Sequence, residues 1–175
     1  GMEKRMKKML EHLTDKKRDH RKRETEIFSV LPIIKSILNN PASKKLNIPP
    51  NLVLPREDNV LVYGDAQRFE NVLLHLVENA QQACAKKDFP EVTLICKCSQ
   101  KNVIISVADN GVGMDENFIK ERLFKPFDTT KGNSGMGLGV YDAKTFAEDH
   151  NGSLTVDSEV NKGTLISLTI PRSGI

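Results

Sequence analysis

The chain has 175 residues, of which 38% are hydrophobic and 28% charged, with a formal net charge of +3. This length and composition predict one soluble domain with its own core. No apolar run approaches the roughly 18 residues that a membrane-spanning helix needs, and no signal peptide is visible.

The positive charge is concentrated at the N-terminus. Residues 1–25 contain ten Lys and Arg against five Asp and Glu, whereas the remaining 150 residues contain 16 and 18. Met2, Met6, Met9 and Leu13 follow a four-three-four spacing, which is typical of a short coiled-coil seam. This segment therefore predicts a solvated basic helix. Because the rest of the chain is not basic, we expect no nucleic-acid partner.

The next stretch predicts short strands around one helix. Residues 26–28 predict an edge strand, and Ser29 is a favourable N-cap for a helix that ends at residues 39–41. Residues 52–54 and 60–63 each predict a strand.

A longer helix is predicted at residues 69–85, with Asp65 as its cap. Its apolar residues recur at helical spacing, at Val72, Leu73, Leu76, Val77, Ala80 and Ala83. His75 and Asn79 are four residues apart and share one face. The carbonyl oxygen of Asn79 suits a hard cation such as Mg²⁺, which binds few protein ligands and keeps several waters. A solvated or capping asparagine is the alternative.

The second half predicts a hairpin, two helices and two closing strands, at residues 91–98, 102–108, 117–123, 138–150, 154–156 and 164–170. Asp115 is expected to cap the first of these helices, and Asn151-Gly152 to end the second in a left-handed turn. Strands and helices are mixed without repeating parallel βαβ units. We therefore predict an α+β two-layer sandwich, with one mixed sheet and helices on one face.

Two glycine clusters follow the predicted strand at 103–108. Asp109 comes directly after it, followed by Gly111 and Gly113, and the second cluster is Gly135, Gly137 and Gly139. A carboxylate can accept from an exocyclic amine, glycines let a ligand lie against bare backbone, and a glycine-rich turn that opens a helix offers N–H groups to phosphate. Each cluster alone could be a plain turn or a flexible loop. Their order within 31 residues indicates a nucleotide pocket.

Five motifs resemble those of the histidine kinase, gyrase, chaperone and MutL ATPase superfamily. They are the N box at His75-Leu76-Val77-Glu78-Asn79-Ala80, the G1 box at 109–114, the F box at 124–127, the G2 box at 135–139, and the final Gly163-Thr164. The resemblance covers residues 26–171. An F box beside a short lid is similar to sensor histidine kinases, and the run at 127–141 is similar to PEP-CTERM-system histidine kinases.

The resemblance implies ATP and Mg²⁺ as ligands. Asp109 would accept from the adenine amino group, and Thr164 would hold Asp109 or a water beside it. Gly111 and Gly113 would let the adenine ring approach, and Asn79 would hold Mg²⁺ against the phosphates. The family fold is the same two-layer sandwich, with ATP between helices and lid.

The phosphate end of the site is expected in the lid and the second glycine cluster. Gly135, Gly137, Leu138 and Gly139 would open the helix whose N-terminus meets phosphate. Lys131 could reach the γ-phosphate as a mobile charge, with Thr129 or Thr130 adding hydroxyl groups; a solvated lid lysine is the alternative. Phe124 and Phe127 are expected to anchor the lid to the core, and not to touch nucleotide.

His75 and Glu78 are the candidate catalytic residues. In the ATP-hydrolysing relatives, a Glu that activates water stands four residues before the magnesium asparagine. Here that position is His75, as in some histidine kinases, and Glu78 points elsewhere on the helix. The resemblance therefore implies transfer of the γ-phosphate to a histidine outside this chain, and not efficient hydrolysis.

The resemblance also implies partners and a domain boundary. Residues 1–25 would be a remnant of a dimerisation hairpin and residues 26–175 the ATP-binding catalytic domain of a cytoplasmic kinase, whose parent could be anchored in the inner membrane. The expected partners are the histidine-bearing dimerisation domain of the parent chain, a response-regulator receiver domain, and a second copy through the N-terminal helix. Two alternatives stay open: an ATP-hydrolysing conformational machine of the gyrase or MutL kind, and a degenerate interaction module.

Overall fold

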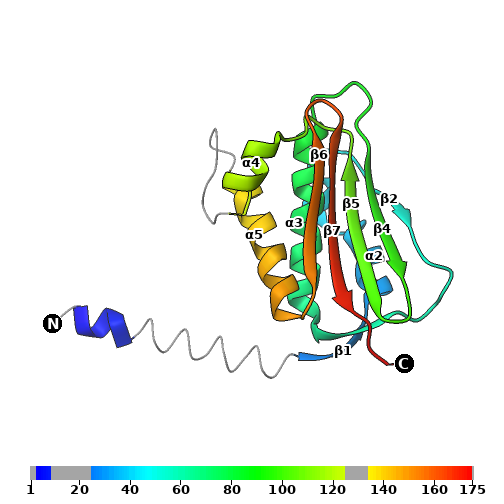
Figure 1. Ribbon diagram of the computed structural model, residues 1–175, viewed down its shortest axis with the longest axis vertical. Coiled ribbons are helices and arrows are strands. Elements are labelled where there is room, and N and C mark those ends of the chain that lie inside the picture. Colours follow the sequence, from blue (N-terminus) through cyan, green and yellow to red (C-terminus); the bar gives the residue numbers. More distant parts are fainter. Residues whose placement is uncertain (1–2, 9–24, 125–133, 175) are drawn as a thin grey trace.

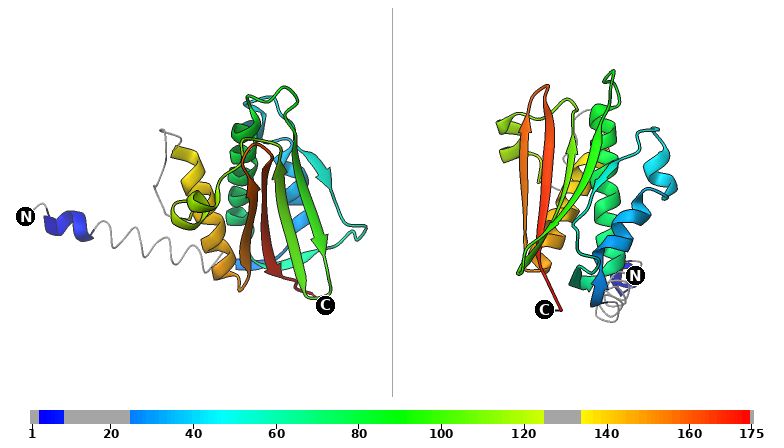
Figure 2. Two further views of the ribbon diagram at one scale, coloured as in Figure 1. Left: turned by 45° about the horizontal axis from the view of Figure 1, so that its top comes forward. Right: turned by 90° about the vertical axis from the view of Figure 1, so that its right-hand side faces the viewer.

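The computed structural model describes residues 3–8, 25–124 and 134–174. A β-sheet forms one layer, and helices cover one of its faces (Figures 1 and 2). This arrangement confirms the predicted two-layer α+β sandwich. Residues 3–8 are helical, whereas Met2, Met9 and Leu13 of the predicted seam lie outside the described residues.

The main sheet is mixed. Its order is β2-β4-β5-β7-β6, with bounds Asn51–Val53 for β2, Val92–Cys98 for β4, Asn102–Asp109 for β5, Gly163–Pro171 for β7 and Ser153–Glu159 for β6. Strand β2 runs parallel to β4, and the other neighbours are antiparallel. Asp109, the last residue of β5, is paired with Thr164 near the start of β7. The ladder therefore brings two predicted site residues together at one end of the sheet.

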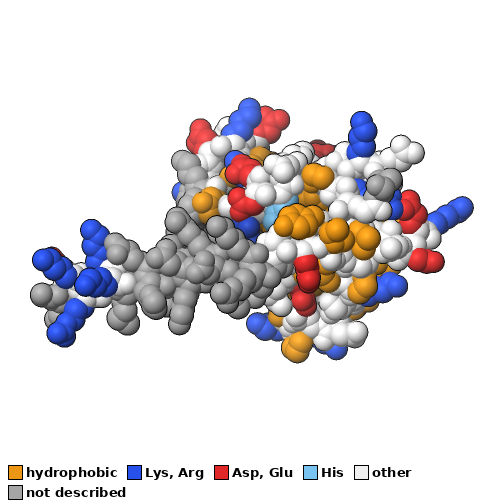
Figure 3. Space-filling view, turned by 90° about the horizontal axis from the view of Figure 1, so that it is seen from below, with side chains coloured by type: hydrophobic (Ala, Val, Ile, Leu, Met, Phe, Trp, Pro, Cys, Tyr) orange, Lys and Arg blue, Asp and Glu red, His pale blue; other side chains and the backbone are white. Residues whose placement is uncertain are grey.

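The strands predicted at 26–28 and 60–63 exist, but they do not join the main sheet. Strand β1 (Thr25–Ser29) pairs antiparallel with β3 (Leu61–Asp65) in a separate ribbon. Phe28 and Val62 lie opposite each other and are buried, whereas Ile27 and Tyr63 on the other face are exposed. The ribbon thus contributes one face to the core. Hydrophobic side chains are also visible on the surface at this end of the molecule (Figure 3).

Four α-helices are described beyond residue 25: α2 (Val30–Ile37), α3 (Ala66–Cys84), α4 (Glu116–Glu121) and α5 (Ser134–Asp149), with a short 3₁₀ turn, η1, at Pro41–Lys44. The carboxylates of Asp65 and Asp115 accept from the N–H groups of Arg68 and Phe118, at 3.1 and 2.7 Å, which confirms both predicted caps.

Ser29 occupies the N-cap position of α2, but the prediction that its side chain caps the helix is wrong, because that side chain makes no capping bond. The N–H of Val30 donates instead to the carbonyl oxygen of Val60, at 3.0 Å. The residue just before β3 therefore supplies a partner at the start of this helix.

Helix α5 begins at Ser134, four residues before the predicted start. Glycine costs an interior helix position about 1 kcal/mol relative to alanine, which is why the sequence pattern placed the glycine cluster outside the helix. Packing outweighs that cost, because Val140, Ala143, Phe146 and Ala147 on this helix are all buried. Asn151, just after the helix, has φ 57°, so the predicted left-handed turn is confirmed.

The core lies between the sheet and the helices, with the ring of Phe69 in α3 near its centre. That ring contacts the rings of Phe28 and Phe146, at centroid distances of 5.5 and 6.0 Å. Contacts of this kind join the ribbon, α3 and α5 into one body. Farther along α3, residues of this helix and of β5 line the candidate site together.

Candidate functional site

A cavity lies between α3, β5 and β7, at the end of the sheet where β5 finishes. Its walls are mainly apolar, and its lining residues are Leu76, Asn79, Ala80, Ala83, Val107, Asp109, Val112, Gly113, Met114, Leu123, Val140, Thr164 and Ile166. The structure thus gathers Asn79, Asp109, Gly113 and Thr164, which the sequence predicted for one site. The open volume is about 30 Å³, room for one or two waters, so a larger ligand requires the walls to move apart.

Asp109 carries the carboxylate of this cavity. Its Oδ1 accepts from the N–H of Gly111 at 2.8 Å. Burial raises the pKa of Asp109, while hydrogen bonds from the backbone of Gly111 and Thr164 act in the opposite direction. An ionised carboxylate has only acceptor atoms. A ligand that offers a donor would therefore replace part of the water that Asp109 has lost.

The Thr164 hydroxyl is held by a serine on the neighbouring strand. Thr164 is 9% exposed, and its Oγ1 lies 2.7 Å from the Oγ of Ser158 in β6. No hydrogen bond between the side chains of Thr164 and Asp109 occurs among the described residues. The expectation was that Thr164 holds Asp109 or a water beside it, and it named no atom. The backbone of Thr164 contacts Asp109 instead, because the β5–β7 ladder pairs the two residues.

Asn79 is 6% exposed, and its Nδ2 is buried without a hydrogen-bond partner among the described residues. An unsatisfied buried amide costs roughly 1–3 kcal/mol, and such groups are uncommon in folded proteins. The amide nitrogen and oxygen are nearly indistinguishable by shape. Helix α3 therefore presents to the cavity an amide that a ligand could satisfy.

Three glycines allow the backbone around the cavity to pack closely. A Cβ at Gly111 would lie 2.4 Å from the carbonyl oxygen of Ala83, and one at Gly113, where φ is +69°, would lie 2.0 Å from that of Glu159. Gly163 has φ +124°, and its Cβ would lie 2.0 Å from the carbonyl oxygen of Asp109. Gly111 and Gly113 were predicted to make room for a ring. The contact that each makes in this structure is with the protein's own backbone.

His75 and Glu78 do not line the cavity. The His75 side chain is 45% exposed, and its Nδ1 lies 3.9 Å from the Oδ2 of Asp142 in α5. Glu78 is half-buried on α3. His75 stands one helical turn before Asn79, on the surface where α3 meets α5, so the structure places both candidate catalytic residues beside the cavity and not within it.

The predicted phosphate end is only partly described. Gly135, Gly137, Leu138 and Gly139 belong to the first turns of α5, whereas Thr129, Thr130, Lys131 and Phe127 lie outside the described residues. Phe124 packs against the core, as expected of an anchor, and the Nζ of Lys144 lies 4.8 Å from the centroid of its ring. In the described part of the chain, the first turn of α5 has backbone N–H groups without partners inside the helix.

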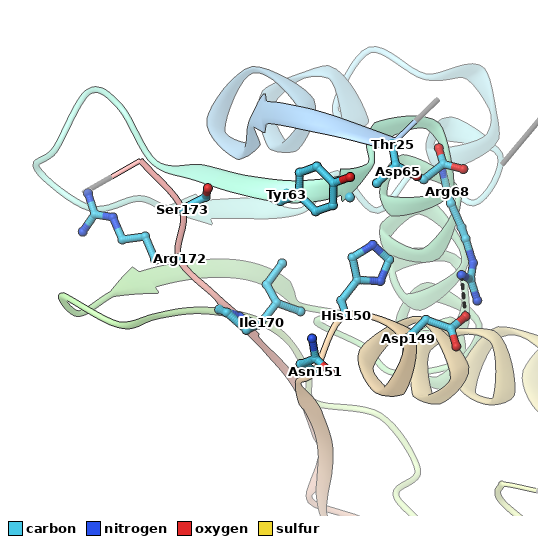
Figure 4. A pocket seen from close by; sticks show the side chains of 12 residues that line it. Thr25, Tyr63, Asp65, Arg68, Asp149, His150, Asn151, Ile170, Arg172 and Ser173 are labelled. Carbon is cyan, nitrogen blue, oxygen red and sulfur yellow. Dashed lines mark hydrogen bonds and ion pairs between the residues drawn. The ribbon is translucent and has the colours of Figure 1, made fainter. Parts of the chain in front are cut away.

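A second cavity lies at the opposite end, between the β1–β3 ribbon and the C-terminal end of α5 (Figure 4). The ring of His150 stacks on that of Phe146 at 3.8 Å, and its Nδ1 lies 2.7 Å from the Phe146 carbonyl oxygen. Burial lowers the pKa of His150, and the charge of Arg68 adds to that effect. Arg68 forms an ion pair with Asp149 at 2.7 Å. This cavity contains none of the predicted site residues.

Sequence reasoning missed Ser158 and His150. A signal for Ser158 was available, because Ser158 shares a face of β6 with Leu154 and Val156, which are partly buried. His150 gave no such signal, since its environment depends on Gly64. A Cβ there would lie 2.2 Å from the His150 Nε2.

Within residues 3–8, 25–124 and 134–174, no cluster of three or more His, Cys, Asp or Glu side chains could hold a metal ion. None of the helices in these ranges is long and apolar enough to cross a membrane.

Comparison with known proteins gives a family match. Residues 64–174 match the model of the histidine kinase-, DNA gyrase B-, and HSP90-like ATPases. The chain is 36% identical over 110 residues to sporulation kinase E of Bacillus subtilis, covering 63% of this chain and 14% of that protein. It is 30% identical over 129 residues to the C4-dicarboxylate transport sensor protein DctB of Rhizobium meliloti, covering 74% and 19%. The chain thus spans less than a fifth of either relative.

Solved structures agree with the family match. The catalytic domain of histidine kinase ThkA, in a nucleotide-free form, superposes with a TM-score of 0.71 at 27% identity, over 86% of this chain and 99% of that one. The neighbour has the same fold over nearly its whole length. The cavity walls contributed by α3, β5 and β7 lie within the matched range 64–174.

Proposed function

Because the chain belongs to the family of histidine kinase-, DNA gyrase B-, and HSP90-like ATPases, we propose that it is the ATP-binding catalytic domain of a sensor histidine kinase. In this proposal, it transfers the γ-phosphate of ATP to a histidine outside the chain. The similarity to sporulation kinase E and to the ThkA catalytic domain favours a histidine kinase over the other members of the family.

The observation that carries the proposal is the cavity at the end of β5. Apolar side chains such as Leu76, Val107 and Ile166 form its walls, and Asp109 places a carboxylate at its edge. A purine ring needs flat apolar contact on its faces and a hydrogen-bonding group at its edge. Asp109 can accept from the exocyclic amine of adenine. We assign this cavity to the adenine ring of ATP.

The Asn79 amide fits the magnesium ion that the family implies. The unpartnered atom is the Nδ2, and a half-turn of the amide group would exchange its nitrogen and oxygen. The oxygen in that position would be a hard ligand of the kind Mg²⁺ takes. Mg²⁺ usually keeps several waters and needs few protein ligands. Bound there, the ion would neutralise charge on the phosphates.

For the phosphates, we propose the first turns of α5, with Gly135, Gly137, Leu138 and Gly139. N–H groups at a helix N-terminus attract anions. Lys131, Thr129 and Thr130, between α4 and α5 in sequence, are proposed to add a charge and hydroxyl groups. The chain's own part in the reaction is then to bind ATP, orient its γ-phosphate and exclude water.

We propose phosphotransfer, and not hydrolysis, as the reaction. His75 lies outside the cavity and close to Asp142, and Glu78 does not reach the cavity either. The position four residues before Asn79 is His75, whereas the ATP-hydrolysing relatives carry there a Glu that activates water. The phosphate acceptor would then come from the dimerisation domain of the parent chain, and a response-regulator receiver domain would take the phosphate from it.

The domain boundary and the cellular setting follow from the same proposal. Residues 1–25 would be the end of a dimerisation hairpin, through which two copies could pair, and residues 26–175 the catalytic domain. We place this domain in the cytoplasm, on a parent chain that a membrane anchors. The finer likeness to PEP-CTERM-system kinases stays a prediction.

The test is autophosphorylation of the parent protein with ATP that carries a radioactive γ-phosphate. A histidine kinase incorporates label that is lost in acid and kept in base, and the Asn79→Ala parent should incorporate none. Release of inorganic phosphate without labelled protein would indicate an ATP-hydrolysing machine instead.

A further inference from the structure

Ser158 joins three segments around the nucleotide cavity without lining it. Its Oγ accepts from the N–H of Met114, at 2.8 Å, and donates to the carbonyl oxygen of Gly163, at 3.0 Å. The same atom lies 2.7 Å from the Oγ1 of Thr164. Met114 and Thr164 both line the cavity, whereas Ser158 does not. Any effect of Ser158 on a bound ligand must therefore act through these two residues.

The three partners of Ser158 fix the direction of the Thr164 hydroxyl. A serine hydroxyl has one proton to donate and two lone pairs to accept with. The Gly163 carbonyl can only accept, so it takes that proton, and the Met114 N–H can only donate, so it occupies one lone pair. The remaining lone pair can only receive a proton. The 2.7 Å bond is therefore donated by Thr164 to Ser158.

Because Ser158 takes its proton, the Thr164 hydroxyl can only accept a hydrogen bond from a ligand in the cavity. Thr164 is paired with Asp109 in the β5–β7 ladder, and an ionised carboxylate also has only acceptor atoms. The polar edge formed by Asp109 and Thr164 thus presents acceptors and no hydroxyl donor. Such an edge suits an exocyclic amine, or a water held by one. It opposes a carbonyl oxygen at the same place, because two acceptors cannot share a hydrogen bond.

We propose that Ser158 is a positioning residue for base selection. By taking the Thr164 proton, it makes this edge of the cavity select adenine over guanine, whose corresponding exocyclic group is a carbonyl. This inference rests on the proposed function, since it presumes that a purine nucleotide binds in the cavity. Ser158 itself makes no contact with the base.

The experiment measures ATP and GTP affinity for the wild type and for Ser158→Ala, by displacement of a fluorescent nucleotide analogue. In the variant the Thr164 hydroxyl can turn and donate to a guanine carbonyl. We therefore expect the preference for ATP over GTP to fall about tenfold, the size expected when one hydrogen bond changes partner. Ser153→Ala, an exposed serine on the same strand, is the matched control and should keep the wild-type preference.

A second pair of variants tests whether Ser158 acts through Thr164. Thr164→Val keeps the side-chain shape and has no hydroxyl to direct. Adding Ser158→Ala to it should therefore change the ATP-to-GTP preference no further, although each single variant lowers it. An additional fall in the double variant would show a different route and overturn the proposal. Should Ser158→Ala not fold, Ser158→Cys, with a weak donor and a weak acceptor, should show the same lowered preference.

The outcomes separate the two claims. If the wild type prefers ATP and Ser158→Ala keeps the wild-type preference, the positioning role is wrong and the proposed function stands. A variant that loses affinity for both nucleotides by the same factor would reduce Ser158 to a structural residue and also overturn the role. If the wild type binds neither nucleotide, both claims fail together.

Discussion

Asp109 and Thr164 lie opposite each other in the β5–β7 ladder, at the end of the sheet where α3 closes the cavity. They are 55 positions apart in the sequence. Antiparallel pairing is what brings the carboxylate and the hydroxyl to the same cavity edge. The binding of adenine that we propose depends on this register, because a shift of one residue would turn Thr164 to the opposite face of the sheet.

Asn79→Ala should abolish magnesium-dependent ATP binding and leave the fold intact. The wild-type amide nitrogen is buried without a partner, which costs folding free energy. The alanine variant loses this cost together with the proposed Mg²⁺ ligand. The midpoint of thermal unfolding should therefore stay the same or rise. Calorimetric titration with Mg-ATP, beside a thermal melt, measures both. Wild-type affinity in the variant would remove Asn79 from the site.

Asp109→Asn should weaken ATP binding at least tenfold and stabilise the ligand-free domain. Asn keeps an oxygen to accept from Gly111, but its amide nitrogen is a donor that opposes the adenine amine. Burial raises the pKa of Asp109, so the folded state binds a proton more readily than the unfolded state. The ionised form therefore costs stability above the folded pKa, and this cost disappears as the pH falls through that pKa.

At neutral pH, Asp109→Asn should have a higher melting temperature than the wild type. The difference between the two melting temperatures should become smaller in acid, and thermal melts at several pH values measure this difference. A lower melting temperature at neutral pH would mean that the carboxylate stabilises the fold, contrary to the shift in its pKa.

Gly113→Ala should destabilise the domain by about 2 kcal/mol or more, since alanine is disfavoured at φ +69° and its Cβ would meet the backbone of Glu159. Denaturant unfolding gives the free energy. The comparison is Gly174→Ala, also at positive φ, whose Cβ would meet only the side chain of Leu61, at 3.0 Å. Equal losses at both positions would show that conformational strain, and not the backbone contact, sets the cost.

Stability should fall as the pH drops below 6.5, the ordinary pKa of histidine, because the pKa of His150 is lowered in the folded state. The unfolded chain then binds a proton before the folded one does, and the loss ends once the pH is below the folded pKa. Arg68 faces the ring with a positive charge, and Asp65 and Asp149 with negative charges. His150→Gln should flatten this part of the pH profile. If the slope of stability against pH stays the same in this variant, other groups cause the loss of stability.

The local elements were predictable because their signals are local. Asp65 and Asp115 cap helices as their positions indicated, and strand β5 delivers Asp109 as the apolar run before it implied. The start of α5 was predicted too late, since its glycines disfavour a helix that packing against α3 nevertheless stabilises. The β1–β3 pairing was also beyond a local pattern, because two short strands do not specify their partners.

For the candidate site, too, the residues were predictable and their contacts were not. Asn79, Asp109 and Thr164 were predicted, and the cavity contains all three. What the sequence could not show is which atom each side chain binds. The Thr164 hydroxyl contacts Ser158 and not Asp109, and the glycines of the loop after β5 accommodate Ala83 and Glu159. Those partners come from other strands and helices, so their contacts exist only once the sheet and α3 have assembled.

The central claim is that this domain binds ATP and does not hydrolyse it by itself. Calorimetric titration of the chain with ATP, with and without Mg²⁺, followed by an assay for inorganic phosphate, tests this claim most directly. We expect binding that Mg²⁺ strengthens, a preference for adenine, and no phosphate release above background. The absence of binding under every condition, or sustained release of phosphate by the chain alone, would contradict it.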